Sequence, residues 1–286
     1  MSRNRRRAGD VAVAVKLSAA LALTAACAAA TPAVTVAAPP TRPSPVAAAP
    51  ALPSPAPPSP SPAVHPLDAF FRALAAAPAA PVRVVQLGDS HTEDGSFVAR
   101  AQERLRARFG EAVTVEGLGV VGAHASQLAA RDWSAFGPEL AARSPALVVL
   151  QYGTNEAASR HAAPNALEET LVSLAARVRE HVPGCSLAVL GPPDLARRDG
   201  ESWVPAPALD DVIAAERRAA ERAGAFFFDA REALRPEGTI DAMARARPRL
   251  AWPDRVHLTP RGYALLADRY ADALLAAFDR WRAPPP

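Results

Sequence analysis

The chain has 286 residues and a formal net charge of +3, but the positive excess is confined to its first part. Residues 1–42 hold six of the 32 basic residues and one acidic residue, so the remainder carries 26 basic and 28 acidic residues, a formal net charge of −2. This balance excludes the basic surface expected of a nucleic-acid-binding protein.

The first 30 residues are predicted to be a secretory signal peptide. A basic segment over residues 1–16 precedes an apolar segment over residues 17–30, which is too short for a membrane span of about 20 apolar residues. Two processing sites stay open: cleavage after Ala30 by an ordinary signal peptidase, or lipidation of Cys27, because LTAAC resembles a bacterial lipobox. A retained membrane anchor is the alternative to cleavage.

Residues 31–66 are predicted to form a disordered linker rich in proline and alanine. Thirteen prolines lie from Pro32 to Pro66, and such a composition favours extended polyproline II over a packed core. The folded domain is expected over residues 67–283, which is long enough for one α/β domain. If Cys27 is removed or lipidated, Cys185 has no partner for an intrachain disulfide, and we expect its thiol to be buried and inert.

Apolar runs alternate with helical patterns along the domain. The candidate strands are 82–87, 112–116, 146–151, 186–191 and 225–228. The candidate helices are 67–77, 95–109, 164–181, 207–223 and 259–281. Strands separated by helices require crossover connections, which make the sheet parallel and cover both of its faces. The predicted fold is therefore α/β, a three-layer α/β/α sandwich around a parallel five-stranded sheet.

Two stretches late in the domain are predicted to contain little regular secondary structure. Residues 192–206, with three prolines and an exposed-looking Trp203, are expected to form a loop over the carboxyl ends of the strands. The interval from Asp194 to Asp254 is expected to hold little more than one helix and one strand, without an extra carbohydrate-binding insertion.

Ser90 is the candidate nucleophile. It follows the apolar strand 82–87 in the sequence GDS, at a sharp exit from the strand. Open α/β sheets bind their ligands at the carboxyl ends of the strands, so a serine at this position is well placed for chemistry. Its neighbour Asp89 is expected to hydrogen-bond within its own turn and to take no chemical part.

Asp254 and His257 are the candidate partners of that serine. Three residues separate them in a loop just before the last helix, so one turn can hold both side chains. The carboxylate can then accept from one ring nitrogen of His257 while the other nitrogen faces a nucleophile.

An oxyanion hole needs hydrogen-bond donors aimed at the developing negative charge. Asn155, in GTNE after strand 146–151, can donate through its amide. Gly122 can offer a backbone N–H after strand 112–116, although Gly117 and Gly119 lie nearby.

Four motifs together resemble one known family. Ser90 in GDSHT, Gly122 in VVGAHAS, Asn155 in GTNE and His257 in DRVH match, in chain order, the four sequence blocks of the SGNH (GDSL-type) hydrolases. The resemblance implies a flavodoxin-like fold, with Ser90 as nucleophile, His257 as base and Asp254 as its orienting acid. It also implies an oxyanion hole from the Ser90 N–H, the Gly122 N–H and the Asn155 side chain.

A finer resemblance concerns the substrate. GDSHT, VGAHAS, YGTNEA and LGPPD at 190–194 look like the peptidoglycan O-acetylesterase branch of that family, which removes acetyl groups from muramic acid. The expected protein is an exported serine esterase of the periplasm or cell envelope that acts on an acetylated glycan or another ester. A lysophospholipase or thioesterase on the same fold, and a catalytically silent glycan-binding protein, are the alternatives.

Other residues near these motifs have plain explanations. His91 and His124 are expected to pack or cap instead of lining a pocket, and Tyr152 fits a core position and a pocket wall equally well. No histidine–cysteine cluster, P-loop or dinucleotide-binding glycine pattern is present in the sequence, and no metal or organic cofactor is expected.

Overall fold

The computed structural model describes residues 65–77 and 79–283 of the chain. The predicted signal peptide, Cys27 and nearly all of the predicted linker lie outside the described residues. No helix in the described part has the length and apolar character needed to cross a membrane.

The central sheet confirms the predicted fold class. In the described residues its five parallel strands lie in the order β2–β1–β3–β4–β7, which is the strand order of flavodoxin-like folds. All five predicted strands are present with shifted ends: β1 (Val82–Gly88), β2 (Val113–Gly119), β3 (Leu147–Gln151), β4 (Ser186–Leu190) and β7 (Phe226–Phe228). Because β1 is paired on both sides, with β2 and with β3, its carboxyl end lies inside the sheet.

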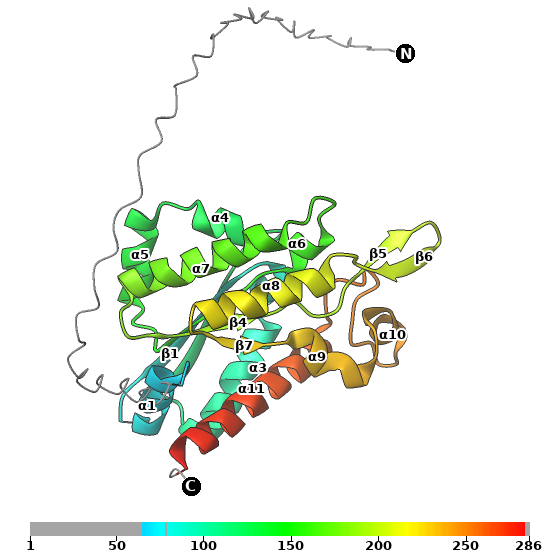
Figure 1. The fold of residues 1–286 in the computed structure, drawn as a ribbon. Coiled ribbons are helices and arrows are strands. Elements are labelled where there is room, and N and C mark those ends of the chain that lie inside the picture. Colours follow the sequence, from blue (N-terminus) through cyan, green and yellow to red (C-terminus); the bar gives the residue numbers. More distant parts are fainter. Residues whose placement is uncertain (1–64, 78, 284–286) are drawn as a thin grey trace, which may run out of the picture. The chain divides into compact units, whose positions relative to one another are not determined.

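Helices cover both faces of the sheet (Figure 1). Helices α1 (Asp68–Ala76), α3 (Ser96–Phe109) and α11 (Pro260–Arg282) share one hydrophobic cluster with Val84 of β1. Helices α5 (Trp133–Ala142), α7 (Pro164–His181) and α8 (Leu209–Arg222) share the other cluster with Val85 of β1. Successive strand residues point to opposite faces, so one strand supplies both cores.

The five long predicted helices are present, and α11 shows why they were predictable. Its buried side chains recur three or four residues apart, at Tyr263, Leu266, Tyr270, Leu274 and Phe278. This spacing places one apolar stripe against the sheet. The apolar stripe of the last helix is therefore part of the core.

Shorter helices escaped the sequence analysis: α2 (Ser90–Glu93), α4 (Ala125–Ala129), α6 (Thr154–Ala158), α9 (Ala230–Leu234), α10 (Ile240–Arg245) and the 3₁₀ helix η1 (Arg235–Glu237). Each spans too few turns to show a periodic apolar pattern. Helix α5 was also missed, because Gly137 and Pro138 lie inside it and both lower helix propensity.

The prediction of a plain loop over 192–206 was wrong. Strands β5 (Ala196–Asp199) and β6 (Ser202–Pro205) form an antiparallel hairpin there. Its two-residue loop begins with Gly200 at a φ of 59°, the conformation that such loops favour. With this hairpin, α8, α9, η1 and α10, the interval 194–254 holds considerably more structure than one helix and one strand.

Candidate active site

Ser90 lies where β1 turns into helix α2. Asp89 is the residue before this helix, and its Oδ1 accepts a hydrogen bond of 2.9 Å from the His91 N–H. The turn needs Gly88, because a Cβ there would lie 2.2 Å from the Thr92 Oγ1 and 2.6 Å from the Gln151 carbonyl oxygen. The tight exit from an interior strand leaves Ser90 half-buried at the carboxyl edge of the sheet.

Ser90, His257 and Asp254 lie in one hydrogen-bonded row. The Ser90 Oγ is 2.9 Å from the His257 Nε2, and the His257 Nδ1 is 2.8 Å from the Asp254 Oδ2. With Nδ1 donating to the carboxylate, Nε2 can accept from the serine hydroxyl, which is the tautomer a base requires. The two partners share a turn, as their spacing predicted.

Hydrogen bonds hold the Asp254 carboxylate in its ionised form. Its Oδ1 accepts from the backbone N–H groups of Val256, at 3.0 Å, and His257, at 3.1 Å. Partial burial raises the pKa of Asp254, but the hydrogen bonds from the His257 ring and these two N–H groups outweigh it, so the net pKa is lowered. A carboxylate that stays charged can stabilise a protonated His257.

Arg255 anchors the loop between Asp254 and His257. Its backbone is in the left-handed region, with a φ of 56°, a conformation that residues other than glycine rarely adopt. Its Nε donates to the Asp241 Oδ1 of α10 at 3.1 Å, and its guanidinium lies 4.7 Å from the ring centroid of Trp203 on β6. Its carbonyl also accepts from the Ala196 N–H of β5 at 2.9 Å. The hairpin and α10 therefore support the loop that carries His257.

Asn155 projects from the first turn of α6, after β3. Its Nδ2 donates to the Ala123 carbonyl at 2.9 Å and lies 3.5 Å from the Asp89 Oδ2. Glycine is required at position 153, because its φ is 98° and a Cβ there would lie 2.5 Å from the Glu216 Oε1. The Asn155 amide is thereby held beside the turn that carries Ser90.

Gly122 lies on the exposed loop between β2 and α4, next to Ala123. Its φ is 73°, and a Cβ at this position would meet nothing within 4 Å. Neither the Gly122 N–H nor the Ser90 N–H donates a hydrogen bond to any described residue. Both donors therefore stay available to an oxygen atom of a ligand.

Glu156 is a supporting residue that the sequence analysis missed. Its Oε2 accepts from the Gly153 N–H at 3.0 Å, and its Oε1 accepts from the Ala125 N–H at 2.7 Å. The side chain thereby ties the loop carrying Asn155 to the loop carrying Gly122. The spacing from Gly153 to Glu156 is that of a helix capping box, a local signal that could have identified this residue.

Two further carboxyl groups are buried beside this region. Burial raises the pKa of Asp89 to about 7; the His91 N–H opposes the rise and the charge of Glu156 adds to it. Glu216 is fully buried, and both of its oxygens lack a hydrogen-bond partner among the described residues. Burial, followed by the charges of Glu156 and Asp89, raises the pKa of Glu216 well above its usual value. The buried site of Glu216 therefore favours the neutral form of its carboxyl group.

His91 is buried behind the row formed by Ser90, His257 and Asp254. Its Nδ1 is 2.9 Å from the Tyr263 hydroxyl, and its ring centroid lies 5.2 Å from that of His257. Burial and the neighbouring His257 lower the pKa of His91 to about 3, so this ring stays neutral. His124 is half-buried, 3.8 Å from the Glu156 carboxylate, and Tyr152 is buried.

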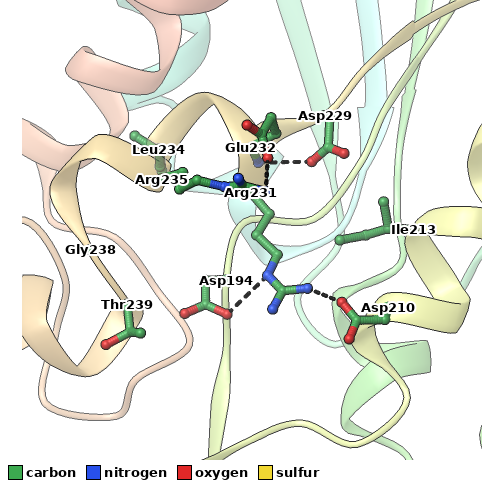
Figure 2. A pocket seen from close by; sticks show the side chains of 10 residues that line it. All are labelled: Asp194, Asp210, Ile213, Asp229, Arg231, Glu232, Leu234, Arg235, Gly238 and Thr239. Atoms are coloured by element: carbon green, nitrogen blue, oxygen red, sulfur yellow. Dashed lines mark hydrogen bonds and ion pairs between the residues drawn. The ribbon is translucent and has the colours of Figure 1, made fainter.

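A charged cavity of about 470 Å³ lies away from Ser90, which is not among its lining residues. Figure 2 shows Arg231 reaching between Asp194, which follows β4, and Asp210 at the start of α8. Asp194 also accepts from the Ile240 N–H at 2.8 Å. The Arg231 guanidinium is therefore paired with the carboxylates of Asp194 and Asp210, and the charged groups of this cavity form an ion-pair network.

A second cavity of about 480 Å³ opens beside the nucleophile turn, where Gly88 and Ala123 form part of its lining. Over residues 65–77 and 79–283, no group of three or more histidine, cysteine, aspartate or glutamate side chains is arranged to hold a metal ion.

Comparisons with known proteins agree with this geometry. A family model described as the GDSL-like lipase/acylhydrolase family matches residues 86–265. No curated protein matches the sequence.

Solved structures show the same fold. A peptidoglycan O-acetylesterase has 17% identity and a TM-score of 0.66, covering 75% of this chain and 96% of its own. LAE5, an α/β hydrolase from the metagenome of Lake Arreo, Spain, has 27% identity and a TM-score of 0.53, with 71% and 98% covered. Axe2, an acetylxylan esterase from Geobacillus stearothermophilus, has 22% identity and a TM-score of 0.51, with 68% and 94% covered.

Proposed function

The chain belongs to the GDSL-like lipase/acylhydrolase family and is an SGNH-type carboxylic ester hydrolase, and from this we propose that it is an exported esterase that removes O-acetyl groups from peptidoglycan or another polysaccharide. The observation that carries the chemistry is the hydrogen-bonded row from the Ser90 Oγ through the His257 ring to the Asp254 carboxylate. In this proposal Ser90 is the nucleophile, His257 the base and Asp254 the residue that orients and stabilises the histidine.

The reaction proceeds through an acetyl-enzyme. The Ser90 Oγ attacks the acetyl carbonyl carbon while its proton passes to the His257 Nε2. The ester C–O bond then breaks, and His257 gives that proton to the departing sugar oxygen. Water attacks the acetyl group on Ser90 in the same way, which releases acetate and restores the serine hydroxyl. No cofactor enters either half of the reaction.

Three donors stabilise the negative oxygen of each tetrahedral intermediate: the N–H groups of Ser90 and Gly122, and the Asn155 amide. One hydrogen of the Asn155 Nδ2 is committed to the Ala123 carbonyl at 2.9 Å. The other has only a long contact of 3.5 Å with Asp89, so it can turn to the oxyanion. Donors held in place before the reaction need no reorganisation as charge develops.

The substrate class is supported by relatives of the same fold. A peptidoglycan O-acetylesterase and an acetylxylan esterase both share it, and both names describe removal of acetyl groups from glycans. The family match supports ester hydrolysis in general.

The substrate is tested by measuring acetate released from O-acetylated peptidoglycan and from acetylated xylan. We expect release from at least one polymer, and none with Ser90→Ala at matched protein concentration. Binding of the polymer without acetate release would instead favour a silent glycan-binding protein.

Export is the second part of the proposal and rests on residues 1–30, where a basic segment precedes an apolar one. The protein is expected to fractionate with the periplasm or with an envelope membrane. If Cys27 is lipidated, Cys27→Ser shifts the protein from the membrane to the soluble fraction without changing its specific activity. Uncleaved chain in the cytoplasm would contradict export.

A lysophospholipase or thioesterase remains the second candidate because of the cavity beside Gly88. Its lining includes Leu87, Leu118 and Phe136, which suit an acyl chain. A series of p-nitrophenyl esters of increasing chain length separates the two candidates. A sharp preference for the acetate ester supports the acetylesterase. A maximum of kcat/KM at a long acyl chain supports the lysophospholipase or thioesterase.

A further inference from the structure

The cavity of about 480 Å³ beside the nucleophile turn is attached to the candidate oxyanion hole. Its lining includes Gly88, Val120 and Ala123. The Val120 N–H donates to the Gly88 carbonyl at 3.0 Å, and the Ala123 carbonyl accepts from the Asn155 amide. Ser90 itself does not line the cavity, but Gly88 lies two residues before it, so a substrate whose ester bond is at Ser90 can extend into the cavity. Its volume falls in the range of small-molecule sites, about 300 to 1,000 Å³.

One wall of the cavity carries a cation that has no carboxylate partner among the described residues. Arg131 is exposed, and its guanidinium lies 4.2 Å from the ring centroid of Phe136, which is buried. No carboxylate among the described residues comes within 4.0 Å of that guanidinium. Stacking uses the face of a guanidinium and leaves the N–H groups at its edge free to bind an anion.

A second donor lines the same cavity. Tyr152 is 3% exposed, and its hydroxyl has no hydrogen-bond partner among the described residues. Burial raises the pKa of Tyr152, the charges of Asp89 and Glu156 add to the rise, and Arg131 opposes it. The phenol therefore keeps its proton, and Arg131 lies near enough to act on it.

The remaining charged residues of the lining are Glu139 and Arg143. The Arg143 Nε is 3.0 Å from the Glu116 Oε2, so that arginine is already paired. Val120 and Val121 at the rim are 62% and 70% exposed, which adds an apolar surface at the mouth. The cavity thus combines apolar walls with an unpaired cation, a free phenol and the exposed Glu139 carboxylate.

We propose that this cavity is a subsite for a carboxylate-bearing part of the alcohol portion of the substrate, bound by the Arg131 guanidinium and the Tyr152 hydroxyl. The inference rests on the proposed acetylesterase function, because an acetyl group of two carbons leaves the cavity to the alcohol side of the ester. A carboxylate matches the planar edge of a guanidinium in geometry and in charge. The subsite therefore favours an acidic glycan over a neutral one such as xylan.

The test compares acetyl esters that carry this carboxylate with the same esters in which the carboxylate is masked as a methyl ester. One pair is 4-acetoxybenzoate and methyl 4-acetoxybenzoate; the other is O-acetylated N-acetylmuramic acid and its methyl ester. Acetate release is measured for each. The wild type should show a lower KM for the carboxylate of each pair, and Arg131→Gln should reduce that preference about tenfold, since a charge-assisted hydrogen bond is lost.

Three variants refine the result. Arg131→Lys keeps the positive charge but lacks the planar guanidinium, so it should retain more of the preference than Arg131→Gln does. Tyr152→Phe removes one donor and should reduce the preference less than Arg131→Gln does. Arg217→Gln removes an arginine that stacks 4.6 Å over Phe227 outside the cavity, so it controls for the loss of a stacked arginine.

Two outcomes with the paired esters overturn the subsite. One is a wild type that treats both members of each pair alike; the other is an Arg131→Gln variant that keeps the full preference. Faster cleavage of p-nitrophenyl octanoate than of the acetate would likewise assign the cavity to an acyl chain. If the sugar esters are not cleaved but the aryl pair shows the Arg131-dependent preference, the carboxylate subsite is supported. The proposal of a glycan substrate is then contradicted.

Discussion

Asn155 is the residue at which oxyanion stabilisation can be separated from substrate binding. The oxyanion exists only near the transition state, so its donor contributes differential binding and affects kcat. Asn155→Ala should lower kcat about 100- to 1,000-fold and leave KM nearly unchanged. Steady-state kinetics with p-nitrophenyl acetate measures both constants. An effect on KM alone would reassign Asn155 to ground-state binding.

The row from Ser90 to Asp254 predicts unequal costs for its two supporting members. In the proposed mechanism His257 moves the proton, whereas Asp254 orients the ring and stabilises its charge. His257→Ala should lower kcat on the order of 10⁶-fold and Asp254→Asn on the order of 10⁴-fold. Single-turnover measurements on an aryl acetate give the rate of the chemical step for each variant and so separate the two effects. Equal wild-type rates for both variants would move the search for the base to His91 or His124.

Asp89 should make the protein less stable as the pH rises toward neutrality. Its pKa is raised from 3.8 to about 7, so between these values the folded chain holds a proton that the unfolded chain has lost. The free energy of unfolding then falls with rising pH, by up to about 1.4 kcal/mol per pH unit for one proton. Asp89→Asn cannot titrate, so urea unfolding at pH 5, 6 and 7 should show a shallower decline.

Asp132→Asn is the matched control for that change. Asp132 precedes α5 and accepts from the Ser134 N–H, as Asp89 does for α2. The hydrogen bonds from Ser134 lower the pKa of Asp132, so its contribution is lost only as the pH falls below the window tested. Its variant should keep the wild-type slope. An unchanged slope in Asp89→Asn would show that this carboxyl is ionised in the fold.

At the scale of elements, the β5–β6 hairpin should act on catalysis through Arg255. Trp203→Ala removes the ring 4.7 Å from the Arg255 guanidinium and loosens the loop that holds His257. Misplacement of a catalytic group by about 1 Å can cost on the order of 100-fold, so kcat should fall by up to this factor while the KM for a small ester changes little. Trp203→Phe keeps an aromatic face and should recover most of the rate.

Arg198→Ala provides the control for the hairpin. Its guanidinium lies 5.6 Å from the same Trp203 ring, but the residue is exposed on β5 and is not part of the His257 loop. Its variant should retain the wild-type kcat. Full activity of Trp203→Ala, with an unchanged profile of kcat against pH, would show that the hairpin does not position His257.

At the scale of the whole molecule, residues 1–66 should be dispensable for catalysis. The buried core begins at Leu67, and a proline-rich chain contributes little packing. We expect chains starting at His65 and at Leu67 to be soluble and active on p-nitrophenyl acetate. The comparison is useful because the Leu67 N–H donates to the His65 Nδ1 at 3.1 Å, so only the longer chain keeps this bond.

Much of the molecule was predictable because the information is local. Apolar runs identified all five strands of the sheet, and the periodic stripe of α11 identified a long core helix. The pairing of Asp254 with His257 was predictable from a spacing of three residues within one turn. Short segments such as α2 and the β5–β6 hairpin were not, because a few residues do not establish a period.

The amino-acid sequence by itself determined the α/β class, and it predicted the bounds of the domain and the residues that do chemistry, because these depend on residue type and short-range spacing. Only the tertiary structure decided what surrounds them. The Ser90–His257 contact joins residues 167 positions apart, and Trp203 meets Arg255 only because the hairpin folds back onto that loop. Arg131, between α4 and α5, and Tyr152, after β3, likewise come to line one cavity only in the folded chain. Contacts between distant segments depend on how whole elements pack, and no local pattern records that packing.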